Sequence, residues 1–121
     1  MNTQAIDAMV AERLFGWNRH IYGNFVNQMQ PPDKPQVNGI DQVEIVPHYS
    51  TNIAAAFAVV EKMTCTTKDY FTLEVFSSGA KATFQTERGE FSHLDSCDNE
   101  VPLCICLAAL RAHGIDPETI P

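Results

Sequence analysis

Residues 70–96, YFTLEVFSSGAKATFQTERGEFSHLDS, decide the fold. Apolar and polar residues alternate in three runs, at 70–76, 80–86 and 90–96, and short turns around Gly79 and Gly89 separate the runs. Alternation is typical of strands that turn one face toward a core, and short glycine-containing turns join neighbouring antiparallel strands. The stretch therefore predicts a three-stranded antiparallel meander.

Helices are predicted on both sides of this meander. Upstream, Ser50 or Thr51 is expected to cap a helix through NIAAAFAVVEKM (52–63). Downstream, VPLCICLAALRA (101–112) is expected to begin after the cap Asn99 and to end at Gly114. The helical spacing of the upstream segment predicts a buried stripe, which consists of Ile53, Phe57, Val60 and Met63.

A third helix is predicted near the start of the chain, at 3–14, where TQAIDAMVAERL has apolar residues three or four apart. Between this helix and residue 50, prolines and glycines exclude a long helix from Gln30 onward, and short elements are expected around 21–29 and 43–46. The segment 43–46 is a candidate fourth strand of the sheet. The predicted fold class is α+β, an antiparallel sheet of three to four strands with helices packed on it, and 121 residues support a single domain over 1–121.

The charge balance limits the class of partner. Fifteen acidic residues against eight basic ones give a formal charge of −7, without a basic block, which argues against general nucleic-acid binding. No apolar run approaches the roughly 18 residues of a membrane span. The first residues lack a basic start and include Asp7, Glu12 and Arg13, so no secretory signal is expected. These features favour a protein of the cytoplasm.

Enzyme signatures are missing from the sequence. It contains no GxxxxGK[ST], GxGxxG, GxSxG or HExxH motif, and its four histidines lie far apart. We therefore expect no catalytic residue, no metal site and no cofactor. The alternative is a Cys97–His93 nucleophile pair at a strand end. Cys104 and Cys106 are expected to be small apolar core residues.

Two arginines are candidate ligand-binding residues: Arg88 at a hairpin tip and Arg111 late in the last helix. Guanidinium groups bind phosphates and carboxylates through paired hydrogen bonds. Arg111 has a simpler alternative role, because a cation near a helix C-terminus is stabilising by itself. The aromatic rings that could stack on a base are Phe84, Phe91 and Trp17, and their alternative place is the core.

The last predicted helix, 101–112, is apolar on nearly all sides. Such a helix must be covered on more than one side, by the sheet and by another helix or another subunit. The alanine-rich helix before the meander would permit close packing against a partner. A homo-oligomer is therefore expected.

Three segments together resemble the phage ABA sandwich domain family, whose name denotes α–β–α layering. They are VAERLFGW (10–17), YSTNIAAAFAVVEKM (49–63) and VPLCICLAALRAHG (101–114). The resemblance implies a phage or prophage protein in the bacterial host cytoplasm. It also implies kinship with the first type of Thoeris anti-defence protein, an oligomeric sponge that binds cyclic ADP-ribose isomers, in some cases cyclic nucleotides, without cleaving them.

One position departs from the family pattern. The last helix of the family usually has ICRAAL, whereas this chain has Leu107 in place of the arginine and keeps Arg111 four residues later. The chain would thus offer one arginine where relatives offer two. The alternative function is that of an acidic accessory protein, which acts through protein–protein contacts of its proline-rich segment 30–47.

Overall fold

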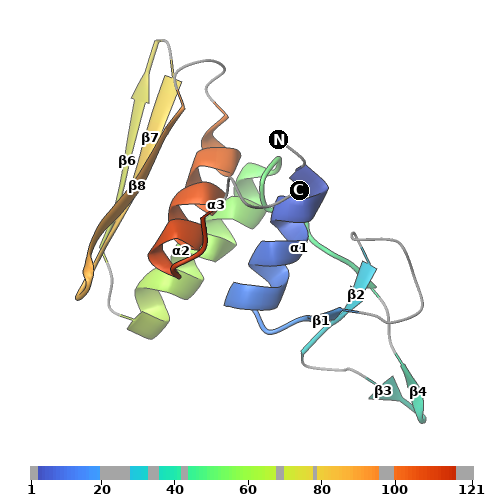
Figure 1. The fold of residues 1–121 in the computed structure, drawn as a ribbon. Helices are drawn as coiled ribbons and strands as arrows, with labels where there is room; N and C mark the ends of the chain where they lie inside the picture. Colours follow the sequence, from blue (N-terminus) through green and yellow to red (C-terminus); the bar gives the residue numbers. More distant parts are fainter. Residues whose placement is uncertain are drawn as a thin grey trace.

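The computed structural model describes residues 3–19, 28–32, 36–41, 44–67, 70–77, 79–95 and 100–116. Its main sheet is the predicted meander, with strand order β6-β7-β8 and antiparallel pairing throughout (Figure 1). The strands span Tyr70–Phe76 (β6), Gly79–Thr86 (β7) and Gly89–Asp95 (β8). The register places Phe71 opposite Phe84, and Phe84 opposite Phe91.

Alternation along the strands separates a core face of the main sheet from a solvent face. Ala80, Ala82 and Phe84 of the central strand β7 are fully buried. The ring of Phe84 contacts the ring of Phe71 on β6, with centroids 4.9 Å apart. Tyr70, whose neighbour Phe71 faces the core, is 75 % exposed on the other face. The period of two in the sequence therefore predicts the buried face correctly.

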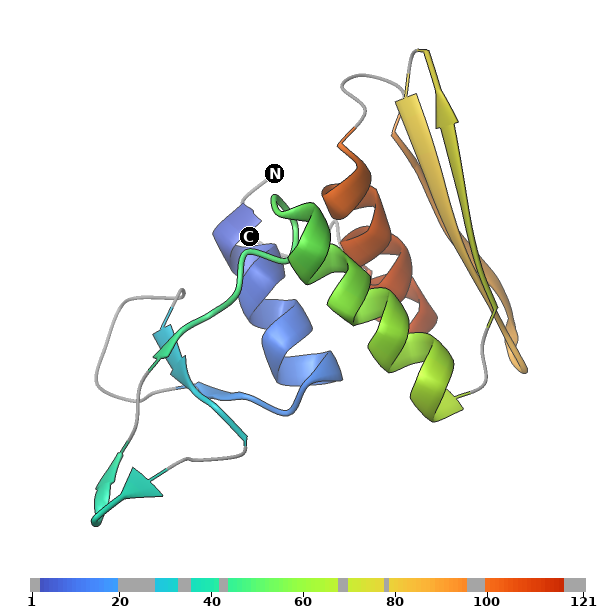
Figure 2. The same ribbon diagram turned by 180° about the vertical axis from the view of Figure 1, so that it is seen from behind.

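Three helices lie on the core face of this sheet, in two layers (Figures 1 and 2). Helix α3 packs on β7 and β8, and α2 lies beside α3 and contacts β6. Helix α1 lies beyond them, on the side away from the sheet. The bounds are Thr3–Leu14 (α1), Ile53–Thr67 (α2) and Val101–Ala112 (α3). The predicted α+β class, with helices packed on an antiparallel sheet, is confirmed.

The apolar faces of α3 are buried by elements of its own chain. The sheet, α2 and α1 surround it, and eight of its twelve residues are buried. Cys104 and Cys106 are among them and are fully buried, as predicted. Since α3 is covered within one subunit, this helix gives no reason for a second copy.

The region before α2 forms two small sheets of short strands, which lie on the α1 side of the molecule (Figure 1). One sheet has the order β1-β2-β5, and the other is the pair β3-β4. The strands are Asn18–Arg19 (β1), Gln28–Gln30 (β2), Gln36–Val37 (β3), Ile40–Asp41 (β4) and Glu44–Ile45 (β5). The predicted strand at 43–46 is therefore not a fourth strand of the main sheet, because β5 pairs with β2. Val43 and most of 21–29 lie outside the described residues.

The helix α2 differs from its prediction at both ends. Asn52 caps it, since its side-chain oxygen accepts the N–H of Ala55 at 3.1 Å, so the caps predicted at Ser50 or Thr51 are wrong. The helix also continues to Thr67, one turn past the predicted end. The buried residues are Ala56, Val59 and Met63, whereas Ile53 and Phe57 are each 46 % exposed. The buried stripe therefore differs from the predicted one, because the elements that contact α2 (α3, α1 and β6) cover the side that carries Ala56, Val59 and Met63.

The ends of α3 show one wrong and one correct prediction. Glu100 occupies the N-cap position, without a side-chain capping bond, in place of the predicted Asn99, which lies outside the described residues. At the other end, Gly114 has φ +78°, a left-handed conformation that favours glycine. The N–H of Ile115 then bonds the carbonyl oxygen of Leu110 at 3.0 Å, which closes the helix.

In the part of the chain that is described, none of the helices has the length and apolar character to cross a membrane.

Candidate functional site

An open hollow of about 500 Å³ lies where the end of α3 meets the edge strand β8. From β8 it is lined by Glu90, Phe91 and Ser92. From the end of α3 and the residues that follow, it is lined by Arg111, Gly114, Ile115 and Asp116. The hollow thus combines one cation, two carboxylates, a hydroxyl and two apolar side chains.

The sequence builds this hollow through the turn at Gly114. The left-handed residue reverses the chain at the end of α3, so that Ile115 and Asp116 return along the helix end. Opposite them, β8 is held by its pairing with β7, which places Phe91 next to the buried Phe84. Two rigid elements therefore set the width of the hollow.

Arg111 is the central polar group of this site. Its side chain is partly buried, and its Nε is enclosed with no hydrogen-bond partner among the described residues. An enclosed donor without an acceptor carries a desolvation cost of about 1–3 kcal/mol. An acceptor on a bound molecule, such as a phosphate or carboxylate oxygen, would remove that cost. Arg111 is therefore the candidate contact for an anionic or carbonyl-bearing group in the hollow.

Arg88 has a different part in the structure. Its Nη2 donates a hydrogen bond of 2.6 Å to the carbonyl oxygen of Ala112, in the last turn of α3. Its backbone N–H donates to the hydroxyl oxygen of Thr86 at 3.1 Å, which fixes the β7–β8 turn. Arg88 thus ties the hairpin to the end of α3, one residue from Arg111, and its Nη2 already has an acceptor.

The aromatic candidates do not come together. Phe91 is partly buried and lines the hollow. Phe84 is fully buried in the core, and no surface of its ring reaches solvent. Trp17 follows α1, packs partly buried against the core and is not part of the lining. Of the five predicted residues, the structure brings Arg111 and Phe91 together at the hollow, with Arg88 beside them.

The carboxylates of Glu90 and Asp116 are the site residues that the sequence prediction missed. They line the same hollow as Arg111. With one arginine and two carboxylates, the lining has a formal charge of −1. The only sequence signal for them is position, since Glu90 precedes Phe91 and Asp116 follows the helix stop at Gly114 by two residues. Carboxylates accept hydrogen bonds from hydroxyl and amino groups, so a ligand with such donors as well as an anion suits the hollow.

Leu107, four residues before Arg111, is 1 % exposed and belongs to the core. The position at which the resemblance implied an arginine therefore holds a buried core side chain in this chain. The site has one arginine from α3, not two.

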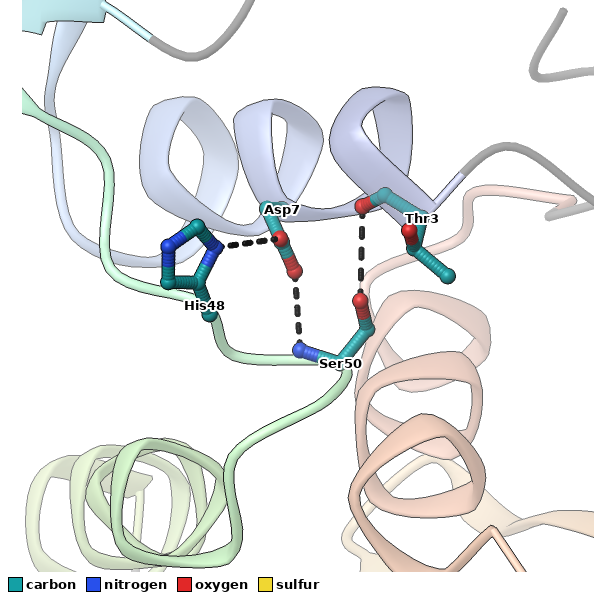
Figure 3. Close-up of polar contacts among 4 residues, drawn as sticks. All are labelled: Thr3, Asp7, His48 and Ser50. Carbon is teal, nitrogen blue, oxygen red and sulfur yellow. Dashed lines mark hydrogen bonds and ion pairs between the residues drawn. The ribbon is translucent and has the colours of Figure 1, made fainter.

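A second polar cluster joins α1 to the segment before α2 (Figure 3). Asp7 is 4 % exposed, and its Oδ1 accepts the backbone N–H of Ser50 at 2.8 Å. The hydroxyl of Ser50 donates to the carbonyl oxygen of Thr3 at 3.3 Å, and Nδ1 of His48 lies 3.9 Å from Oδ2 of Asp7. Burial raises the pKa of Asp7, although the bonds from Ser50 and the nearby His48 act in the opposite direction.

The chemistry of this cluster is structural. Although it contains serine, histidine and aspartate, the Ser50 hydroxyl is bonded to a backbone carbonyl, and His48 is on the outside with its side chain 63 % exposed. Two further groups close to this cluster are also affected by burial. Burial raises the pKa of Tyr49 to about 12, and it raises the pKa of the Cys106 thiol as well. Both groups stay neutral at physiological pH. Tyr49 stacks on Phe15 with ring centroids 5.0 Å apart, which closes this part of the core.

No metal centre is formed by the described residues, since nowhere among them do three histidine, cysteine, aspartate or glutamate side chains converge. Of the alternative Cys97–His93 pair, Cys97 lies outside the part of the chain that the structure describes.

Comparison with known proteins defines the class. Residues 8–110 match the phage ABA sandwich domain, and the chain belongs to this family. A crystal structure of a phage protein from Bacillus cereus ATCC 14579 has the same fold, with a TM-score of 0.70 over 96 % of this chain and 91 % of that chain. The sequences are 21 % identical, so this likeness extends to the fold alone. No curated protein matches the sequence.

Proposed function

We propose that this phage-family protein binds a nucleotide-derived signalling molecule in the Arg111 hollow and sequesters it without converting it, which would counter a host defence. The molecule would be a cyclic ADP-ribose isomer or a cyclic oligonucleotide. The observation that carries the proposal is the enclosed Nε of Arg111, which lacks an acceptor among the described residues. A phosphate oxygen of the ligand would supply the acceptor.

The other lining residues suit the rest of such a ligand. Glu90 and Asp116 offer carboxylates that can accept hydrogen bonds from ribose hydroxyls. Phe91 offers an apolar surface for a base. The hollow has a volume of about 500 Å³, which is within the usual range for small-molecule sites of roughly 300–1,000 Å³. A single arginine would bind one phosphate group, so we expect a ligand with few phosphates.

Isothermal titration calorimetry of the full chain with cyclic ADP-ribose isomers and with cyclic di- and trinucleotides tests this proposal. We expect Arg111→Ala to bind ten- to a hundredfold more weakly, since a hydrogen bond to a charged group contributes about 1.5–3 kcal/mol. Arg13→Ala is the matched control, because Arg13 is an exposed arginine on α1. Absence of binding at high micromolar concentration, or equal affinity of native chain and Arg111→Ala, would refute the proposal.

The claim that the ligand is held and not converted needs its own measurement. After prolonged incubation with the protein, heat denaturation should release the ligand with its original mass and chromatographic retention. Any time-dependent product that requires the native chain would show catalysis and contradict sequestration.

A second candidate function is that of an acidic accessory protein that binds another protein. It is favoured by two exposed aliphatic side chains in the proline-rich region, Ile40 on β4 and Ile45 on β5, which are 67 % and 62 % exposed. Capture of a host protein that is lost in the Ile40→Asp and Ile45→Asp variants, with ligand binding absent, would support this function over sequestration.

A further inference from the structure

Among the described residues, β6 is an outer strand of the main sheet with which no other strand pairs on its far side, and it carries large exposed apolar side chains. β6 is an outer strand in the order β6-β7-β8, and three of its seven side chains are large, apolar and exposed. They are Tyr70 (75 %), Val75 (59 %) and Phe76 (42 %). Proteins normally protect an outer strand with charges, prolines or bulges, because its unpaired backbone groups can pair with another chain. β6 contains no proline and one charge, Glu74.

Helix α2 is the helix that lies next to β6. α2 contacts β6, whereas α3 packs on β7 and β8, so α2 lies toward the free edge. Its exposed side chains include Ile53 and Phe57, each 46 % accessible. A strand edge alone is narrow, and a stable interface buries roughly 1,200–2,000 Å² in total. Because α2 is the helix that contacts β6, it is the element that would add area to a contact made through this edge.

We propose that β6 pairs antiparallel with β6 of a second copy of this chain. The two-fold axis is perpendicular to the sheet and lies midway between Leu73 of one copy and Leu73 of the other, an arrangement called the Leu73 axis below. The two main sheets then form one continuous six-stranded antiparallel sheet. Pairing of this kind satisfies the outer backbone groups of both copies and gives the exposed side chains of β6 new neighbours across the joined edge.

The register follows from face and charge. Core-facing residues lie opposite core-facing residues only if the residue at the centre of the pairing lies opposite its own equivalent in the second copy. The possible central residues are therefore Thr72, Leu73 and Glu74. If Glu74 is the central residue, the Glu74 carboxylates of the two copies lie opposite each other, which is destabilising. An axis at Thr72 leaves Val75 and Phe76 beyond the paired segment. An axis at Leu73 pairs all seven residues.

The pairs produced by the Leu73 axis are complementary. Tyr70 lies opposite Phe76 of the partner subunit on the solvent face, and Phe71 lies opposite Val75 of the partner subunit on the core face. Aromatic–aromatic and aromatic–β-branched pairs are favourable cross-strand neighbours. Glu74 meets Thr72 of the partner subunit and keeps Lys81 opposite it within its own sheet. The one acidic group on the edge is therefore balanced.

Charge also favours this flank for a second copy. Each chain has a formal charge of −7, so two copies repel each other over most of their surfaces. β6 offers a surface with a single carboxylate that already faces a lysine. The Arg111 hollow lies at β8, the opposite edge of the sheet, so both hollows stay open in such a dimer.

Sedimentation velocity and light scattering of the full chain at micromolar concentration test the proposal. We expect a mass of twice 13.5 kDa, and Val75→Lys should raise the dimer dissociation constant at least tenfold. Ile45→Lys is the matched control, because it places a lysine at an equally exposed aliphatic position away from β6. A native monomer, or a dimer that Val75→Lys leaves intact, would overturn the proposal.

Disulfide trapping tests the register. Leu73→Cys should form a covalent dimer on mild oxidation, because the new thiol of one copy lies opposite the same thiol of the second copy. Tyr70→Cys should cross-link far less, although Tyr70 is the more exposed position, and the native chain controls for the four original cysteines. Preferential cross-linking through Tyr70→Cys would refute the Leu73 axis. Loss of nucleotide binding in Arg111→Ala bears on the hollow alone and leaves this result unchanged.

Discussion

The carboxylate of Asp7 accepts the backbone N–H of Ser50 at 2.8 Å, across 43 positions of the sequence. The bond joins the middle of α1 to the turn that precedes α2, and both residues are almost fully buried. The Ser50 hydroxyl adds a second link, to the Thr3 carbonyl oxygen (Figure 3). The polar link therefore adds to the apolar burial of α1, whose Ile6, Val10 and Leu14 belong to the core.

Asp7→Ala should destabilise the protein by about 1–3 kcal/mol, because it leaves the buried N–H of Ser50 without its acceptor. Urea unfolding followed by tryptophan fluorescence measures the change, since the single tryptophan, Trp17, lies at the end of α1. Glu61→Ala, at an exposed carboxylate of α2, is the control and should leave the unfolding midpoint unchanged. Equal midpoints for both variants would show that the link contributes nothing.

The pH dependence of stability should reveal the burial of Asp7. Its pKa is raised in the native state above the ordinary 3.8, mainly by desolvation. Between the two pKa values the native state binds more protons than the unfolded state, so stability from this group is full below 3.8 and falls as the pH rises through the native pKa. Asp7→Asn removes this titration.

The difference in unfolding free energy between the native chain and Asp7→Asn, measured from pH 3 to pH 7, isolates that contribution. It should shift against the native chain as the pH rises above 3.8. A difference that stays constant over the whole range, or that shifts in favour of the native chain, would contradict a raised pKa.

The Asp7 link also shows where sequence patterns reach their limit. Alternation and helical spacing are local, and they predict the meander and all three helices. Nothing local distinguishes Asp7 from an acidic residue near a helix start, because its partner is 43 positions away. The exposed Ile53 and Phe57 were predicted to be buried for a related reason. Apolar spacing predicts that a helix has an apolar face. Which residues of α2 are buried depends on where its packing partners lie, and the spacing does not reveal that.

The candidate site divides in the same way. Residue chemistry selects Arg111 and Phe91 from the sequence, and both line the hollow. Phe84 and Phe91 are opposite each other on the same face of the sheet, and their patterns are alike. Phe84 is on the central strand and is fully buried, whereas Phe91 is on an edge strand beside the end of α3. Strand order, which composition does not reveal, decides which ring a ligand can reach.

Arg88→Ala should lower stability by about 1 kcal/mol and leave ligand affinity nearly unchanged. The guanidinium donates a hydrogen bond of 2.6 Å to the carbonyl oxygen of Ala112 and so satisfies an acceptor in the last turn of α3. The loss is modest because this bond is only partly buried. Chemical unfolding and calorimetry on the same variant separate the two effects. Arg111→Ala should show the reverse, with weaker binding and little loss of stability.

Both arginines lie close to the hollow, so this pair of variants provides its own control. A strong loss of affinity in Arg88→Ala at full stability would mean that Arg88 leaves Ala112 to bind the ligand. That outcome would contradict the role in helix capping.

Leu107→Arg should destabilise the fold by about 3–5 kcal/mol and should not add a second ligand-binding arginine. Leu107 is 1 % exposed, so the substitution removes a packed side chain and introduces an unpaired charge into the core. Leu107→Met, which conserves volume, is the control and should cost less than about 1.5 kcal/mol. Thermal and urea unfolding measure both. If Leu107→Arg instead unfolds at the native midpoint and binds the nucleotide more tightly, the arginine side chain reaches the hollow from this position, and the packing of the core around Leu107 does not exclude a second ligand-binding arginine.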